Sequence, residues 1–146
     1  MIHYYDLHTL TSSQVNDLLE LIHELNPEIT VTAEMLERAA KAPETHLFAA
    51  LDDDNHVLGS ASLCVFDSPT GRKASIEDVV VSSGSRRQGI GRTLIEHIID
   101  FARQQLGDVD LHLTSRPERV AANELYRTMG FEEMGTNMYQ LKIRDE

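Results

Sequence analysis

The sequence has very little cysteine and no long apolar run. Among its 146 residues the single cysteine is Cys64, which excludes an intramolecular disulfide and a cysteine-based zinc cluster. No apolar stretch approaches the roughly 20 residues that cross a bilayer. The first ten residues also lack the basic and apolar segments of a signal peptide. These absences predict a soluble, cytoplasmic protein that does not bind membranes.

Positive charge is scarce as well. The chain has 13 Lys and Arg against 24 Asp and Glu, a formal net charge of −11. Such a chain offers no extended positive field to hold a nucleic-acid backbone. Its seven histidines show no spacing typical of a metal site, such as H-E-x-x-H. We therefore expect no nucleic-acid partner and no metal.

The length and the apolar patterning fit one globular domain. At 16.4 kDa the chain is near the commonest domain size, so residues 1–146 are expected to form a single domain. Apolar periodicity and capping residues predict helices over 11–25, 32–42, 91–106 and 119–129. Strands are expected over 2–7, 46–51, 57–66, 73–82, 110–115, 131–134 and 138–143. This order indicates a mixed sheet with helices on both faces, of the α/β or α+β class.

The segment VVVSSGSRRQGIGRTL joins a buried strand, a loop and a helix. Arg86, Gly89 and Gly91 follow the spacing R-x-x-G-x-G. Glycines let the backbone curl until several N–H groups point at one place, at the positive end of the helix dipole. Arg86, Arg87 and Arg92 add countercharge there. The pattern predicts a pyrophosphate site, and the alternative is a glycine-rich turn with solvated arginines.

Two stretches resemble conserved blocks of the GNAT superfamily of acetyl-CoA-dependent N-acetyltransferases, particularly its small, bacterial-type, single-domain members. The first is IEDVVVSSGSRRQGIGRTLIEHIIDFAR, and the second is LHLTSRPERVAANELYRTMGFEEM. The second places Asn123, Tyr126, Gly130 and Phe131 in the spacing N-x-x-Y-x-x-x-G-F. The resemblance implies the GNAT fold, with a central mixed, mostly antiparallel sheet of about seven strands. It also implies transfer of acetyl from acetyl-CoA to a primary amine by direct attack.

The resemblance assigns roles to individual positions. In the family the loop backbone binds the CoA pyrophosphate, and the preceding strand pairs with the pantetheine arm. An asparagine contacts the pantetheine region and a tyrosine lies near the thioester sulfur. The matching cosubstrate-binding residues are Val79, Val80, Val81, Arg86, Arg87, Gln88, Gly89, Ile90, Gly91, Arg92, Asn123 and Tyr126.

Catalysis needs a base and an acid. An acceptor amine with a pKa near ~10.4 is mostly protonated at pH 7, so a base must remove a proton, directly or through water. We favour Glu77 as this base, and the alternatives are Asp78 or a water chain. A bulge in the strand could also turn Glu77 away from the site. The non-catalytic alternative is that both carboxylates simply pair with surface arginines. A backbone N–H of Val79 or Val80 is expected to stabilise the oxyanion. Tyr126 is expected to protonate the leaving thiolate, the alternative being a half-buried core tyrosine.

The acceptor has no signature in the sequence. The expected substrate is the primary amine of an unidentified small molecule or peptide. One alternative is an amino sugar phosphate, because I-E-D-V-V-V also resembles the strand of glucosamine-phosphate acetyltransferases. Another is a non-catalytic acyl-CoA-binding module, against which Glu77, Asn123 and Tyr126 argue. A homodimer is expected on the resemblance alone.

Overall fold

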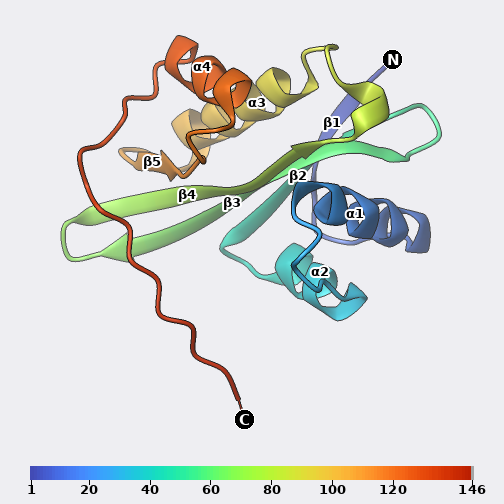
Figure 1. Cartoon of the computed structure of the whole chain (residues 1–146), viewed down its shortest axis with the longest axis horizontal. Coiled ribbons are helices and arrows are strands. Elements are labelled where there is room, and N and C mark those ends of the chain that lie inside the picture. Colours follow the sequence, from blue (N-terminus) through green and yellow to red (C-terminus); the bar gives the residue numbers. More distant parts are fainter. Residues whose placement is uncertain (146) are drawn as a thin grey trace. The chain divides into compact units, whose positions relative to one another are not determined.

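The computed structural model describes residues 1–145 and divides into two compact units, Met1–Thr114 and a second beginning at Ser115. Each helix expected from the sequence is present (Figure 1). The elements of the first unit, in chain order, are β1 (His3–Leu7), α1 (Ser12–Leu25), α2 (Ala33–Lys41), β2 (Thr45–Leu51), β3 (Val57–Ser68), β4 (Gly71–Val81), the short 3₁₀ turn η1 (Ser83–Ser85), α3 (Ile90–Gln105) and β5 (Asp110–Leu113). The second unit holds α4 (Val120–Thr128).

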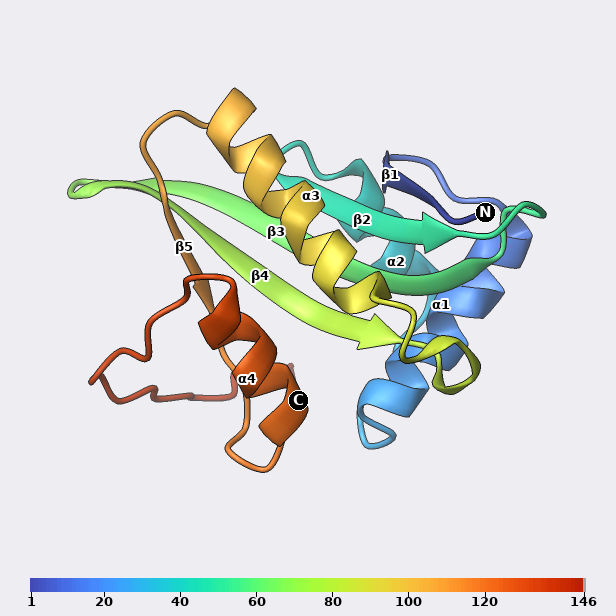
Figure 2. The ribbon, with the colours of Figure 1, turned by 90° about the horizontal axis from the view of Figure 1, so that it is seen from above.

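The sheet is mixed and mostly antiparallel, as predicted. Its strand order is β1-β2-β3-β4-β5. The first three pairings are antiparallel, and β4 pairs with β5 in parallel. A parallel pair needs a long crossover connection. Helix α3, which follows β4 and precedes β5 in the chain, supplies this connection and lies across one face of the sheet (Figure 2).

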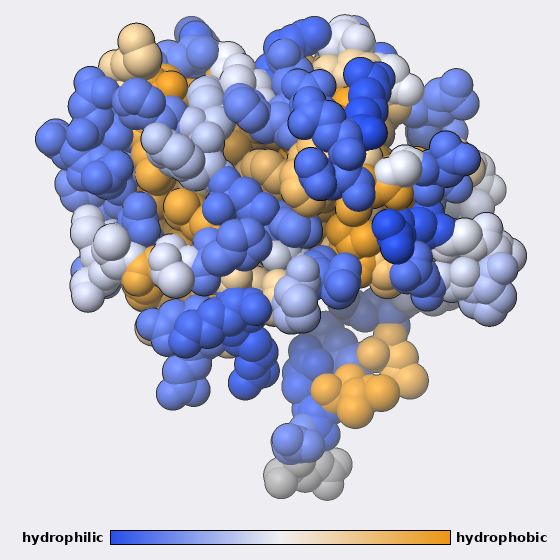
Figure 3. Space-filling model, turned by 180° about the vertical axis from the view of Figure 1, so that it is seen from behind, coloured by the Kyte–Doolittle hydropathy of each residue, from blue (hydrophilic) through white to orange (hydrophobic). Residues whose placement is uncertain are grey.

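The predicted strand count is wrong: the sheet has five strands among the described residues, not seven. Residues 131–134 and 138–143 form no strand there. Their apolar residues suit a strand, but a strand also requires a neighbouring backbone to share its hydrogen bonds. Met138, Tyr139, Leu141 and Ile143 are instead 78–86% exposed. Apolar side chains of this C-terminal segment are visible at the lower end of Figure 3.

The first two helices begin where their capping residues predict. Thr11 Oγ1 accepts a hydrogen bond from the Gln14 N–H, and Gln14 Oε1 accepts one from the Thr11 N–H, both at 3.1 Å. This reciprocal pair is a capping box. Thr32 Oγ1 accepts from the Met35 N–H at 3.2 Å at the start of α2. Local side-chain chemistry therefore sets both helix starts.

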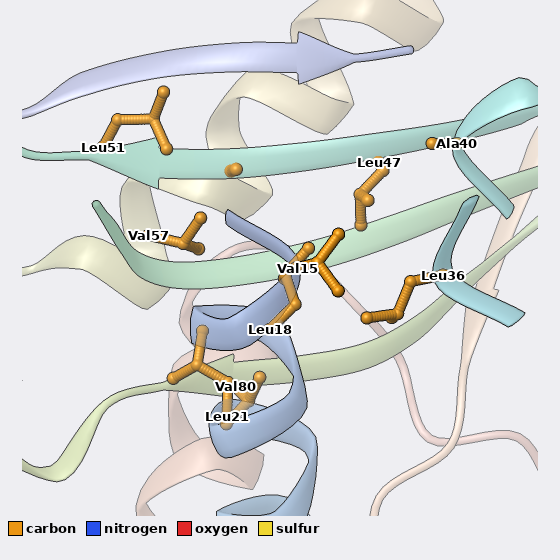
Figure 4. Packing of buried hydrophobic residues seen from close by; sticks show 10 residues of the cluster. Val15, Leu18, Leu21, Leu36, Ala40, Leu47, Leu51, Val57 and Val80 are labelled. Carbon is orange, nitrogen blue, oxygen red and sulfur yellow. The ribbon is translucent and has the colours of Figure 1, made fainter. Parts of the chain in front are cut away.

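Helices cover both faces of the sheet in the first unit. Helices α1 and α2 lie on one face and α3 on the other (Figures 1 and 2). Residues 47–51 of β2 are all buried, since side chains pointing either way meet a helix. On the α1 and α2 face the apolar cluster contains Val15, Leu18, Leu21, Leu36, Ala40, Leu47, Ala49, Leu51, Val57 and Val80 (Figure 4). Among residues 1–145, no helix has both the length and the apolar character of a membrane span.

Candidate active site

The loop between β4 and α3 leaves several backbone N–H groups without a helical partner. Arg87 and Gly89 both adopt left-handed backbone conformations, with φ of 68° and 73°. Gly89 is the N-cap of α3 and has no side chain to cap the helix. The first intrahelical bond runs from Thr93 N to Gly89 O at 3.0 Å. The N–H groups of residues 90–92 therefore lie before the helical hydrogen-bond ladder, which suits an anion.

Three arginines accompany this uncapped helix end. Arg86 and Arg87 are both exposed, and the Arg86 Nε donates to Val81 O at 3.4 Å. Arg92 Nε lies 3.1 Å from Glu96 Oε1, so part of its charge is already offset. The N–H groups and the guanidinium groups of Arg86 and Arg87 are the chemistry that a pyrophosphate requires. The residues present therefore fit the group predicted from the sequence.

The carboxylate of Glu24 on α1 accepts hydrogen bonds from Ser83, in the loop between β4 and α3. Ser83 donates to Glu24 from both its N–H and its hydroxyl, each bond being 3.2 Å long. Sequence reasoning missed Glu24, which is 59 residues away from Ser83. The available signal was its position in the last turn of α1, where the helix dipole disfavours a carboxylate. A carboxylate in this unfavourable position indicates a hydrogen-bond partner outside its own helix.

Gly59 on β3 is needed where α3 meets the sheet. A Cβ added there would lie 3.0 Å from Val80 O and 3.1 Å from Ile90 Cγ2. Both distances are tight, and one neighbour is backbone. The sequence marks Gly59 only as a poor strand former. In the structure it lets the first residue of α3 approach the sheet.

Gly59→Ala is expected to lower the free energy of unfolding by about 1–3 kcal/mol, because the added methyl must displace Ile90 or β4. The matched control is Gly84→Ala in η1, where an added Cβ has no neighbour within 4 Å. Urea unfolding of both variants measures the difference. Equal stabilities would show that the close approach at Gly59 is easily relieved.

Strand β4 contains a β-bulge beside its two carboxylates. Ser62 pairs with Glu77 and Ser60 pairs with Val80, so Ala61 faces both Asp78 and Val79. Asp78 has a left-handed φ of 53°. A bulge takes one residue out of the hydrogen-bond ladder. Backbone groups at this point are thereby released for another partner.

The carboxylates at the bulge differ in environment. Glu77 is exposed, and Glu77 Oε1 accepts a hydrogen bond from Ser75 Oγ at 2.5 Å. Although Asp78 keeps much of its solvent contact, desolvation raises its pKa, with a further contribution from the charge of Glu77. A carboxylate with a raised pKa is a better base near neutral pH. The nearby Cys64 thiol is half-buried, and burial raises its pKa, which disfavours the nucleophilic thiolate.

The second unit contains the other predicted residues. Asn123 Nδ2 donates to Arg116 O at 3.0 Å. Tyr126 is 6% exposed, and burial raises its pKa. Gly130, with φ of 99°, ends the helix. Phe131 then folds back, its N–H bonding Tyr126 O at 3.0 Å and its ring lying edge-on 6.1 Å from the Tyr126 ring. The spacing N-x-x-Y-x-x-x-G-F therefore describes a helix end that fixes the tyrosine.

Comparison with known proteins gives the family. The model of the Acetyltransferase (GNAT) family matches residues 13–131. This match covers more than half of the chain and extends across both units. The chain therefore belongs to the GNAT acetyltransferase family.

Individual relatives agree in fold and vary in acceptor. Streptothricin acetyltransferase from Streptomyces lavendulae is 34% identical over 99 residues, which are 66% of this chain and 51% of the relative. The chain thus spans about half the length of this curated relative. The solved structure of AAC(6')-Iy with the bisubstrate analogue CoA-S-monomethyl-acetylneamine matches with a TM-score of 0.76 at 17% identity, covering 99% of both chains. Glucosamine-6-phosphate N-acetyltransferase from Arabidopsis thaliana matches with a TM-score of 0.74 at 18% identity, covering 97% of this chain and 98% of that one. At these identities the two structures show the fold alone.

Proposed function

We propose that this chain is an N-acetyltransferase that moves acetyl from acetyl-CoA to the primary amine of a small molecule or peptide. Both units are proposed to act as one catalytic domain, because the family match runs through their boundary. The observation that carries the proposal is the succession along β4 and α3. Two carboxylates at a bulge are followed by an uncapped helix end with free N–H groups and arginines.

Acetyl-CoA is proposed to bind along this succession. The N–H groups of Ile90, Gly91 and Arg92 would hold the pyrophosphate, with charge from Arg86 and Arg87. Gln88 and Gly89 complete the loop, and the backbone of Val79, Val80 and Val81 would pair with the pantetheine arm. The amide of Asn123 would contact the same arm, and the Tyr126 hydroxyl would lie near the sulfur.

The acceptor amine must lose a proton before it attacks. Glu77 is proposed as the base, directly or through one water, with Asp78 as the alternative. The formal net charge of −11 favours the approach of a cationic amine. The negative field therefore helps the acceptor, while Arg86, Arg87 and Arg92 concentrate positive charge at the loop.

The transfer step is a direct displacement. The amine nitrogen bonds to the acetyl carbon, and the carbon–sulfur bond breaks. The oxyanion that develops would accept a hydrogen bond from the N–H of Val79 or Val80 at the bulge. The ammonium loses two protons in all: Glu77 takes the first before attack and passes it to solvent, and it takes the second as the amide forms. Tyr126 gives one proton to the leaving sulfur and regains one from solvent, so one proton is released per turnover. The amine attacks the thioester itself, so no acyl-enzyme is formed.

Thiol release from acetyl-CoA across a panel of amines tests the proposal. The panel contains polyamines, amino acids, peptide N-termini, lysine peptides, streptothricin and amino sugar phosphates. The last class is the second candidate, because the I-E-D-V-V-V strand bearing Glu77 resembles that of glucosamine-phosphate acetyltransferases. Saturable turnover on one class would identify the acceptor. Saturable CoA binding without turnover on any amine would instead indicate a non-catalytic acyl-CoA-binding module.

Glu24→Ala is expected to raise the KM for acetyl-CoA by about three- to tenfold with little change in kcat, because two hydrogen bonds worth about 0.5–1.5 kcal/mol each orient the loop. Glu20→Ala, one turn earlier on the exposed face of α1, is the matched control. Steady-state kinetics with acetyl-CoA varied measures both. An unchanged KM in Glu24→Ala would mean that Ser83 does not position the cosubstrate loop.

A further inference from the structure

Three potential ligand side chains meet at the end of β1, outside the proposed active site. Asp6 Oδ2 lies 2.7 Å from His46 Nδ1 and 3.3 Å from His8 Nε2. One ligand atom from each residue lies within 4.8 Å of the other two. Sheet register explains the meeting. Asp6 pairs with Phe48, so His8 continues opposite His46 on the same face.

The hydrogen bonding of His8 leaves a conflict that a cation would resolve. His8 Nδ1 lies 3.3 Å from the carbonyl oxygen of Ala40, which can only accept, so Nδ1 carries the proton. In a neutral ring the lone pair of Nε2 then faces the Asp6 carboxylate oxygen. Two acceptors facing each other repel. A second proton on His8 or a metal ion between the two atoms removes the repulsion.

Two further observations favour a metal ion. Asp6 Oδ1 is buried and has no hydrogen-bond partner within the part of the chain described, so one of the two carboxylate oxygens has no positive partner. The His46 ring is held by Phe101, with ring centroids 4.5 Å apart, and its side chain is only 16% exposed. The bond from His8 Nδ1 to Ala40 O is the kind of outer contact that orients a metal-ligating histidine.

We propose that His8 Nε2, His46 Nδ1 and the Asp6 carboxylate bind a divalent transition-metal ion of the zinc type. Two imidazoles and one carboxylate suit zinc, and water would fill the remaining coordination positions. Ligand atoms around a tetrahedral ion with bonds of about 2.0–2.1 Å lie about 3.3 Å apart. The distance between His8 Nε2 and Asp6 Oδ2 is already 3.3 Å. The distance between His46 Nδ1 and Asp6 Oδ2 is 2.7 Å and must increase when the ion binds.

The surroundings give the ion access and a structural consequence. His8 lines a pocket of about 250 Å³ beside Glu37 and Lys41 of α2, which leaves the site reachable from solvent. A bound ion would join the edge strand β1 to β2. Through the His8 bond to Ala40 O, it would also fix β1 against α2. Metal binding is therefore expected to stabilise the fold without involving the residues proposed for acetyl transfer.

Titration of the tag-free, metal-free full chain with Co²⁺, followed by visible absorption, and with Zn²⁺, followed by calorimetry, tests the site. One ion per chain is expected, with a rise in Tm. His8→Gln and Asp6→Asn are each expected to weaken binding by at least about tenfold. The matched control is His3→Gln, since His3 Nε2 pairs with Asp53 Oδ1 at 3.1 Å but, among residues 1–145, forms no cluster with a third His, Cys, Asp or Glu.

The His8 variant keeps the test independent of folding. The His8 side chain is 55% exposed, so its replacement is not expected to unfold the chain, and circular dichroism checks this. Failure of the wild type to bind either ion would overturn the proposal. Equal binding by wild type, His8→Gln and Asp6→Asn would overturn it as well. A proton on His8 would then be what separates the two acceptors.

Discussion

Glu77→Gln is expected to lower kcat by about 10²–10⁴-fold, the usual contribution of a general base. Glutamine keeps the size of the side chain and its ability to accept from Ser75 Oγ. It cannot take the proton that the acceptor amine must lose. The KM for acetyl-CoA should change little, because the loop and α3 do not depend on this carboxylate. Steady-state kinetics with saturating amine measures the effect.

Asp78→Asn is the matched control and carries a pH prediction. Desolvation and the charge of Glu77 raise the pKa of Asp78, so the folded chain holds this proton more tightly than the unfolded chain. Stability contributed by the protonated form is therefore lost as pH rises from the ordinary aspartate range through the raised pKa. Asp78→Asn should be at least as stable as the wild type at pH 7, and this difference in the free energy of unfolding should vanish at low pH.

A larger loss of kcat in Asp78→Asn than in Glu77→Gln would make Asp78 the base.

Tyr126→Phe is expected to lower kcat by about 10²-fold or more with little change in the KM for acetyl-CoA. Phenylalanine preserves the ring packed against Phe131 and removes only the hydroxyl. With ordinary pKa values near ~10 for tyrosine and ~8.5 for a thiol, proton transfer to the thiolate is uphill by about 2 kcal/mol. Burial raises the pKa of Tyr126, so the gap in the resting chain is wider.

Varying the acidity of the leaving thiol in the acyl donor provides a control for the acid role of Tyr126. An acetyl thioester of a more acidic thiol needs less help from an acid, so the loss in Tyr126→Phe should shrink with that donor. Phe131→Leu disturbs the packing but keeps the hydroxyl, and its loss should not depend on the donor. An unchanged rate in Tyr126→Phe would contradict the acid role. The raised pKa of Tyr126 also predicts that any alkaline limb from this residue in the kcat profile falls at higher pH than for an ordinary tyrosine.

Most of the helices, and the two stretches that resemble the GNAT superfamily, were predictable from the sequence. Thr11 and Thr32 cap helices as their positions predict, and Gly130 ends α4 with a positive φ. The loop after β4 forms as R-x-x-G-x-G predicts, with Gly89 left-handed at the helix start. These features depend on contacts within a few residues and on the backbone freedom of glycine. Such signals are complete in the local sequence.

Other features of the site needed the tertiary structure. The bulge at Asp78 exists only because β3 and β4 pair in one register. Glu24 meets Ser83 because α1 lies against the end of β4. Gly59 matters because α3 starts above it. In each case the partner is distant in the chain, so no local pattern indicates it.

The sheet and the proposed metal cluster show the same contrast between local patterns and long-range contacts. Apolar patterning identified five strands correctly and added two, because it reads side chains and not the availability of a neighbouring backbone. The spacing of Asp6 and His8 places them on one face of a strand, but His46 joins them only through the pairing of β1 with β2. The sequence by itself determined the family, the helices and the glycine loop before α3, since these follow from short-range geometry. Only the tertiary structure decided the strand count, the bulge and the meeting of distant polar groups, because long-range backbone pairing sets them.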